Sequence, residues 1–183
     1  MTPLPMLWLP ILVSAVFVFI AANLLWMALP FWHRKDYGRL ADEATVLGAL
    51  RNAASGQYAV PLLDWKSVTP EQRAEIQKGP MGVLIVRNPS AFSFPKTLVC
   101  YFIYLIVVST FIAYLTGITL PRTADYMRVF RVAGTAGVLA YSFNTIADSI
   151  WYGKPWTVTF KVVVDGVIFG LLIAGVFGWL WPR

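Results

Sequence analysis

Residues 97–120 read TLVCYFIYLIVVSTFIAYLTGITL, a stretch that contains no Asp, Glu, Lys or Arg and lies between Pro95 and Pro121. At about 1.5 Å per residue, a helix of this length crosses the roughly 30 Å hydrocarbon core of a bilayer. Soluble domains typically have about 25% charged residues, whereas this chain has 13% charged and 58% hydrophobic residues. The stretch therefore predicts a transmembrane helix in an integral membrane protein.

Three more stretches of the chain are apolar over a similar length. Trp8 and Trp32 flank the first, and Trp156 and Trp181 flank the last, so each pair is about 36 Å apart along a helix. Tryptophan prefers the two headgroup levels of a bilayer, which matches this spacing. We therefore expect an all-α integral membrane protein, a four-transmembrane-helix bundle forming a single membrane domain over residues 1–183. The helices are expected at about residues 7–31, 97–120, 127–150 and 156–181.

The region between the first two predicted helices, residues 33–96, is polar and rich in local structure signals. Residues 42–56 have the spacing of a helix, and residues 69–72 (TPEQ) form a capping box with proline at the first helical position. Residues 57–63 and 82–87 have the composition of short strands that could pair. These signals predict a small mixed α/β cap, whose core needs the membrane surface or a partner to complete it.

The distribution of basic residues gives the predicted bundle an orientation. The net charge is +6, but the basic residues do not alternate with exposed aromatic residues along a soluble face, so no nucleic-acid partner is expected. Eleven Lys and Arg residues lie on the side of the 33–96 region, and four lie on the other side. Because cytoplasmic flanks hold the excess of Lys and Arg, we expect the cap inside and both termini outside. Residues 1–32 lack charge and signal-peptide features, so the first helix is expected to be retained.

Four polar residues fall at neighbouring levels of the predicted hairpin between the third and fourth helices, and a fifth falls at a similar depth in the first helix. Charged side chains in a bilayer normally face the bundle interior and pair there, because an isolated charge costs about 2.5–3.5 kcal/mol on insertion scales. Two interpretations stay open: a proton, ion or ligand step, or a structural salt bridge that docks the two helices. The residues of this expected intramembrane polar cluster are Asn144, Asp148, Lys161, Asp165 and Asn23.

Small residues recur at every fourth position of the predicted fourth helix and form a smooth stripe, which lets helix backbones approach closely in lipid. Ala133 and Gly137 offer a matching surface on the third helix. The stripe predicts helix packing within the chain or, as the alternative, a seam between two copies. Its residues are Gly166, Gly170, Ala174 and Gly178.

A basic cluster directly follows the first predicted helix. Such a cluster can bind anionic lipid headgroups or an acidic partner, or it can serve only as the positive-inside anchor of the helix. The residues concerned are His33, Arg34, Lys35 and Arg39.

Catalytic and cofactor motifs are missing from the sequence. One cysteine, Cys100, and one histidine, His33, cannot supply a metal-ligand set or a haem ligand pair. The sequence also has no P-loop, no dinucleotide-binding fingerprint and no Ser-His-Asp arrangement. We therefore expect no cofactor, no metal and no enzymatic activity.

Three segments together resemble small bacterial inner-membrane proteins that have no assigned activity. The segments are residues 30–40 (PFWHRKDYGRL), 133–137 (AGTAG) and 148–156 (DSIWYGKPW). The resemblance implies a location in the bacterial inner membrane and says nothing of mechanism. From the residues themselves we expect a non-enzymatic accessory, scaffold or interaction component whose cap meets a protein partner. The alternative is a small transporter or channel component, which needs a homo-oligomer because four helices are few for a pathway.

Overall fold

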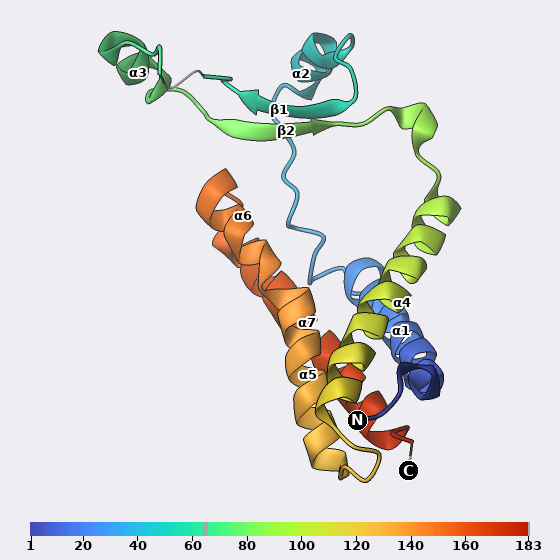
Figure 1. The fold of residues 1–183 in the computed structure, drawn as a ribbon. Helices are drawn as coiled ribbons and strands as arrows, with labels where there is room; N and C mark the ends of the chain where they lie inside the picture. The colour runs from blue at the N-terminus through green and yellow to red at the C-terminus, as the bar shows by residue number, and fades with distance from the viewer. Residues whose placement is uncertain (64–65, 183) are drawn as a thin grey trace. The chain divides into compact units, whose positions relative to one another are not determined.

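The computed structural model describes residues 1–63 and 66–182, and the chain divides into two compact units. The first, here called the membrane unit, comprises Met1–Tyr37 and Phe94–Arg183 and holds the long helices. The second, here called the hairpin unit, comprises Gly38–Ser93 and holds short helices and a two-stranded sheet. Figure 1 shows the helices and strands that make up each unit.

Three helical segments are long and apolar enough to cross a membrane, among the residues that the structure describes. They match the first, second and fourth predicted helices to within a few residues, so length and composition support a membrane protein. The first begins with a 3-10 turn (Leu4–Leu7), continues as α1 (Trp8–Asn23) and ends in a π-helical turn (Leu24–Ala28). The other two are α4 (Phe94–Thr119) and α7 (Trp156–Trp179).

The single helix predicted at residues 127–150 is replaced by two shorter helices. α5 (Tyr126–Ser142) and α6 (Asn144–Tyr152) are separated at Phe143, and neither is among the three segments of spanning length. Periodicity in the sequence could not reveal this interruption, because apolar residues continue on both sides of it. A fourth span is therefore not formed by one uninterrupted helix.

The break between α5 and α6 lies where this pair touches α7. The Ser142 hydroxyl donates a hydrogen bond to the Val163 carbonyl oxygen of α7 at 3.2 Å. Just beyond, the Ile146 N–H bonds to the Phe143 carbonyl, three residues back instead of four, which is a tightened turn. α6 then ends at Gly153, whose φ of 68° is a left-handed conformation that favours glycine.

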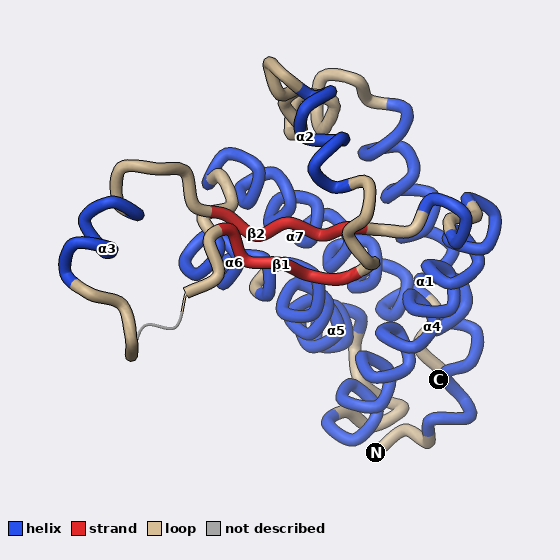
Figure 2. Tube along the Cα trace, turned by 90° about the horizontal axis from the view of Figure 1, so that it is seen from above, coloured by secondary structure: helices blue, strands red, loops and turns tan. Residues whose placement is uncertain are grey.

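Four long helices pack together in the membrane unit. α5 lies along α7 and α1 lies against α4, while α1 also contacts α7 and α4 contacts α5 (Figure 2). The outer faces stay apolar as well; Phe111, for example, is 67% exposed. A helix that is apolar on all sides is expected in lipid. The largest apolar side chains that are fully buried between the helices are Phe177, Leu7, Leu105, Ile112 and Ile173.

The small-residue stripe of α7 packs against α5 within the chain. A Cβ added to Gly137 would lie 2.9 Å from the Gly170 Cα, and one added to Gly170 would lie 2.7 Å from the Val138 backbone nitrogen. Such distances are too short for a side chain, so the two backbones meet directly. The other members of the stripe also lie close to α5. Gly166 lies against Ser142, Ala174 against Gly134 and Gly178 against Tyr126.

In the hairpin unit, two strands pair as the sequence predicts. β1 (Gly56–Val60) is antiparallel to β2 (Gly82–Val86), with Tyr58 opposite Leu84 and Gln57 opposite Ile85 (Figure 2). Side chains therefore alternate between the two faces of the hairpin.

Two short helices accompany this sheet. α2 (Glu43–Leu50) begins at Asp42, whose carboxylate accepts the Thr45 N–H at 3.1 Å, and it is shorter than the predicted 42–56. α3 (Pro70–Ile76) begins with the predicted capping box, because Thr69 and Gln72 each bond to the other's backbone N–H. A 3-10 turn, Pro89–Ala91, follows β2.

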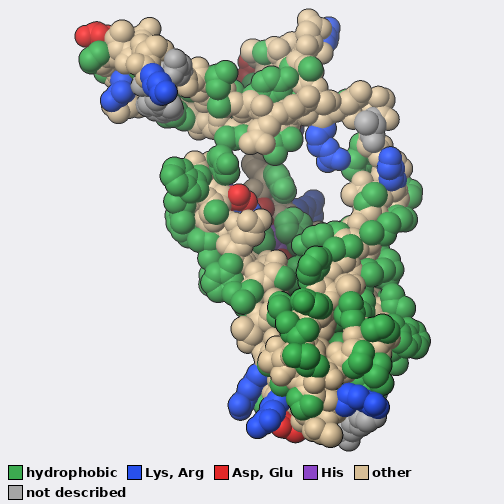
Figure 3. Space-filling model, in the orientation of Figure 1, with side chains coloured by type: hydrophobic (Ala, Val, Ile, Leu, Met, Phe, Trp, Pro, Cys, Tyr) green, Lys and Arg blue, Asp and Glu red, His purple; other side chains and the backbone are tan. Residues whose placement is uncertain are grey.

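The hairpin unit has almost no core of its own. α2, α3, β1 and β2 contain no buried residue, and large apolar side chains such as Leu47 and Ile85 are 64% and 68% exposed. Figure 3 shows apolar side chains on the surface of these elements. A two-stranded sheet without packing partners is marginally stable in water at best.

Candidate functional site

The candidate site is a buried cluster of charges in the membrane unit, and it begins in the turn that follows α1. Pro30 has no N–H and disfavours helical geometry at Leu29, so the first span stops there. The chain then turns tightly: the Asp36 N–H bonds to the His33 carbonyl oxygen at 3.0 Å. This turn sets the His33 and Asp36 side chains beside each other.

His33 lies at the centre of the cluster. Its Nδ1 is 2.6 Å from Asp36 Oδ2, and its Nε2 is 2.7 Å from Asp165 Oδ2 on α7. All three side chains are within 4% of complete burial. The contact joins residues 132 positions apart in the sequence and thereby ties the turn after α1 to the middle of α7.

Three more side chains complete the cluster. Lys161 Nζ donates to Asp36 Oδ1, and Trp32 Nε1 donates to Asp165 Oδ1 at 2.7 Å. The Trp26 ring stacks on the His33 ring with centroids 3.8 Å apart and planes 11° apart. A flat ring over an imidazole covers one face of it. In the residues that the structure describes, every side chain of this cluster thus has a partner.

Charge balance follows from the hydrogen bonds. Ionised carboxylates only accept, so His33 can satisfy two ionised aspartates together only when both of its ring nitrogens carry a hydrogen. In that state His33 and Lys161 carry two positive charges against the two negative charges of the aspartates. A neutral, hydrogen-bonded set of charges is the arrangement in which burial is tolerated.

Asp36 is subject to opposing effects. Burial acts to raise its pKa, but hydrogen bonds from Lys161 and His33, together with their positive charge, outweigh burial and lower the pKa of Asp36 below its ordinary value of 3.8. The carboxylate is therefore ionised throughout the neutral pH range.

The residues of the polar cluster predicted from sequence are only partly brought together. Lys161 and Asp165 are both in the buried cluster, but each bonds to the 32–36 turn and not to the other. Asp148 lies apart and pairs with Lys154 at 3.7 Å. Asn144 is exposed at the start of α6. The prediction omitted the turn after α1, whose carboxylate and imidazole take the partners that α7 offers.

Asn23 and the basic cluster after α1 have separate surroundings. The Asn23 side chain donates to the Phe19 carbonyl oxygen at 2.7 Å within α1. His33 is 4% exposed, and its ring nitrogens face Asp36 and Asp165. Arg34 and Lys35 are exposed. Arg39 belongs to the hairpin unit and pairs with Glu43 at 3.0 Å.

Three cluster residues were missed in the sequence: Trp26, Trp32 and Asp36. Trp32 was predicted to lie in the headgroup belt, because aromatic residues at a helix end usually lie there, and Trp26 was not singled out. One signal for Asp36 was present, since it follows His33 by three residues, which is the reach of a single turn.

A pocket of about 500 Å³ opens beside the cluster, between α1, α4, α5 and α7. Asp165 lies on its wall, together with Trp26 and several other aromatic side chains. Across residues 1–63 and 66–182, no three His, Cys, Asp or Glu side chains are grouped so that they could hold a metal ion. The chemistry available at this site is therefore hydrogen bonding, charge and aromatic contact.

Comparisons of the chain with protein family models, with curated proteins and with solved structures found no match. Its function is therefore inferred from the contacts that its own residues make.

Proposed function

We propose that this chain is a non-enzymatic component of a bacterial inner membrane that binds a protein partner through its hairpin unit. The observation that supports this most strongly is the exposure of large apolar side chains on a unit without a buried core, among them Leu47, Leu62 and Ile85. Exposed apolar patches of this kind mark interaction sites. Because the 38–93 segment holds nearly as many acidic as basic residues, six Lys or Arg against five Asp or Glu, an apolar partner surface suits it better than an acidic one.

The proposal includes a fourth membrane crossing made by α5 and α6 together. Residues 126–152 would span about 40 Å as helix at 1.5 Å per residue. The pair lies along α7 and joins it through the tight turn at Gly153 (Figure 1). A segment that runs antiparallel beside a spanning helix shares its depth.

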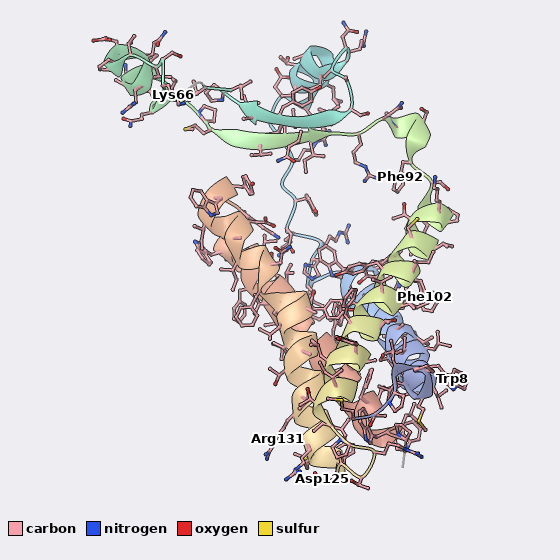
Figure 4. All side chains as sticks on the ribbon, viewed as in Figure 1. Trp8, Lys66, Phe92, Phe102, Asp125 and Arg131 are labelled. Carbon is pink, nitrogen blue, oxygen red and sulfur yellow. The ribbon has the colours of Figure 1, made fainter. Side chains whose placement is uncertain are left out.

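Four crossings put the hairpin unit and the Gly153 turn on one side of the membrane, which the charge distribution assigns to the cytoplasm. Asp125 and Arg131 lie at the opposite end of the membrane unit (Figure 4), the end at which Figure 1 marks N and C. Thr2 bonds there to the Gly117 and Leu120 carbonyl oxygens.

The buried cluster has a structural part in this proposal: it fixes the turn after α1 on α7. Its charged groups are paired with one another, and all but Lys161, which is 22% exposed, are almost completely buried, as suits a docking element. The hairpin unit is then attached to a rigid frame at Tyr37, directly after the cluster.

A second function, transport by an oligomer of this chain, is favoured by one observation: Asp165 lines a pocket in the membrane unit. A transport role predicts that liposomes containing the chain show ion or proton flux and that Asp165→Asn abolishes it. Flux that persists unchanged in Asp165→Asn would count against this function.

The partner proposal is tested by purifying the tagged full chain in mild detergent and identifying the proteins that accompany it. Ile85→Lys places a lysine on the exposed apolar face of β2 and changes the net charge by +1, whereas Glu75→Lys places a lysine at a polar, exposed position of the same unit and changes the net charge by +2. We expect one protein to accompany the wild type and Glu75→Lys and to be lost from Ile85→Lys. A chain that purifies alone, or equal recovery from both variants, would contradict the proposal.

A further inference from the structure

The pocket beside the cluster has the size and lining of a small-molecule site. Its volume is about 500 Å³, within the range of about 300–1,000 Å³ that is common for ligand pockets. Most of its wall is apolar, and spanning helices α4 and α7 supply much of it. Five aromatic side chains contribute: Trp26, Tyr101, Tyr104, Tyr141 and Phe169.

One polar group on this wall lacks a partner. The Tyr141 hydroxyl is the only buried side-chain oxygen or nitrogen with no hydrogen bond among the described residues. Buried polar groups are nearly always bonded, so an unpaired hydroxyl points to an acceptor that a bound molecule would bring. The Asp165 oxygens are not free for this purpose, because they accept from Trp32 and His33.

The aromatic arrangement and the charge balance define the ligand further. The Tyr141 ring packs nearly perpendicular to Phe169, with centroids 5.6 Å apart, and to Tyr104, with centroids 6.4 Å apart, so the pocket wall offers aromatic surfaces at this position. A planar ring has favourable contacts with such surfaces. A charged ligand is disfavoured, because the charges of the adjacent cluster are paired with one another and most of the remaining wall is apolar.

We propose that this pocket binds an uncharged, planar, membrane-soluble ring compound with a carbonyl oxygen that accepts a hydrogen bond from the Tyr141 hydroxyl. The quinone class has this chemistry. The proposal concerns binding alone and does not depend on the partner of the hairpin unit.

The test compares two probes that differ only in the carbonyl groups, menadione and methylnaphthalene. The full chain is placed in lipid nanodiscs, and bound probe is measured by equilibrium dialysis against empty nanodiscs. Tyr141→Phe removes one hydroxyl that has no partner, so its melting curve should match the wild type. Tyr114→Phe, at a 51% exposed position of α4, is the matched control. Leu98→Trp adds bulk to the pocket wall.

We expect saturable menadione binding that Tyr141→Phe weakens roughly five- to tenfold, the usual effect of one lost hydrogen bond. Methylnaphthalene should bind equally to both proteins. Tyr114→Phe should change neither probe, and Leu98→Trp should weaken both about tenfold or more. The proposal is wrong if menadione does not exceed its uptake by empty nanodiscs, or if either Tyr141→Phe or Leu98→Trp leaves its binding unchanged. Tighter binding of the cationic probe phenyltrimethylammonium would also overturn it.

Discussion

At the scale of single residues, the buried cluster requires polar side chains to lose their hydration. Its contacts therefore indicate what holds the 32–36 turn against α7. His33, Asp36, Lys161 and Asp165 bring four charges out of water, and each loses solvation that only its partners can replace. Removing one partner from a buried pair typically costs about 3–5 kcal/mol, since the remaining charge is left uncompensated. The cluster thus fixes the 32–36 turn at one position on α7.

The pairing of Lys161 with Asp36 predicts a particular energetic coupling. In double-mutant cycles, Lys161→Met and Asp36→Leu should show a coupling energy of about 1–3 kcal/mol, because the two side chains share a hydrogen bond. Lys161→Met and Asp165→Leu should couple less, since no direct bond joins them. The free energy of unfolding in mixed micelles gives each value. A stronger coupling of Lys161 with Asp165 would contradict the observed pairing.

The lowered pKa of Asp36 predicts a dependence of stability on acid. A carboxyl group whose pKa is lower in the folded protein stabilises it above the ordinary pKa and loses this effect as the pH falls through the folded-state value. The stability advantage of the wild type over Asp36→Asn should therefore be constant near neutral pH and shrink once the pH is below 3.8. Melting curves recorded from neutral to acid pH measure it. An advantage that does not change with pH would show that Asp36 is not held ionised by its neighbours.

The sequence alone identified charged residues that need partners inside the membrane. It did not identify which residues those partners are. An acid and a lysine inside a predicted span, Asp165 and Lys161, are conspicuous by composition alone. Their partners come from a turn more than 120 positions away, and no local pattern reports such a contact.

At the scale of helices and strands, the closest packing in the membrane unit lies between α5 and α7. Glycine at the contact lets the backbones approach, and lipid offers no hydrophobic driving force that could substitute for this fit. The stripe on α7 is thus occupied by the chain's own α5.

Gly170 and Gly175 of α7 form a matched pair for a test of this packing. A Cβ on Gly170 would collide with the Val138 backbone, whereas a Cβ on Gly175 would meet nothing within 4 Å. Gly170→Ala should lower the free energy of unfolding by about 1–3 kcal/mol through overpacking. Gly175→Ala should leave it unchanged or raise it slightly, as alanine favours helix. Equal effects of both substitutions in detergent unfolding would exclude a tight contact at Gly170.

The crossing proposed for α5 and α6 predicts that their outer ends lie on opposite sides of the membrane. With Cys100 replaced by Ala, cysteines at Thr123 and Tyr152 are labelled with a membrane-impermeant thiol reagent. Thr123→Cys should react in intact cells, and Tyr152→Cys only after lysis. Labelling of both positions from the same side would show that α5 and α6 do not cross.

Elements were predictable where one local signal decides them. Apolar runs of membrane length predicted three spans, and the 69–72 capping box predicted the start of α3. The break at Phe143 was not predictable, because it depends on how Ser142 meets α7. The lengths of α2 and of the strands also differ from prediction, since their ends are set by turns and not by periodicity.

At the scale of the whole molecule, the two units differ in what holds them together. The membrane unit has a packed apolar core and a paired charge cluster, whereas the hairpin unit exposes its apolar residues. In the function proposed above, the membrane unit anchors the chain and a partner protein covers the apolar residues of the hairpin unit.

Photocrosslinking in living cells tests this claim most directly. A photoreactive amino acid replaces Ile85 on β2, which is 68% exposed, and, as the control, Ile20 on α1, which is 51% exposed within a spanning helix. The account predicts that Ile85 forms a discrete adduct with one protein, while Ile20 forms adducts with lipid. Adducts of Ile85 with lipid alone, or with no molecule other than water, would contradict it.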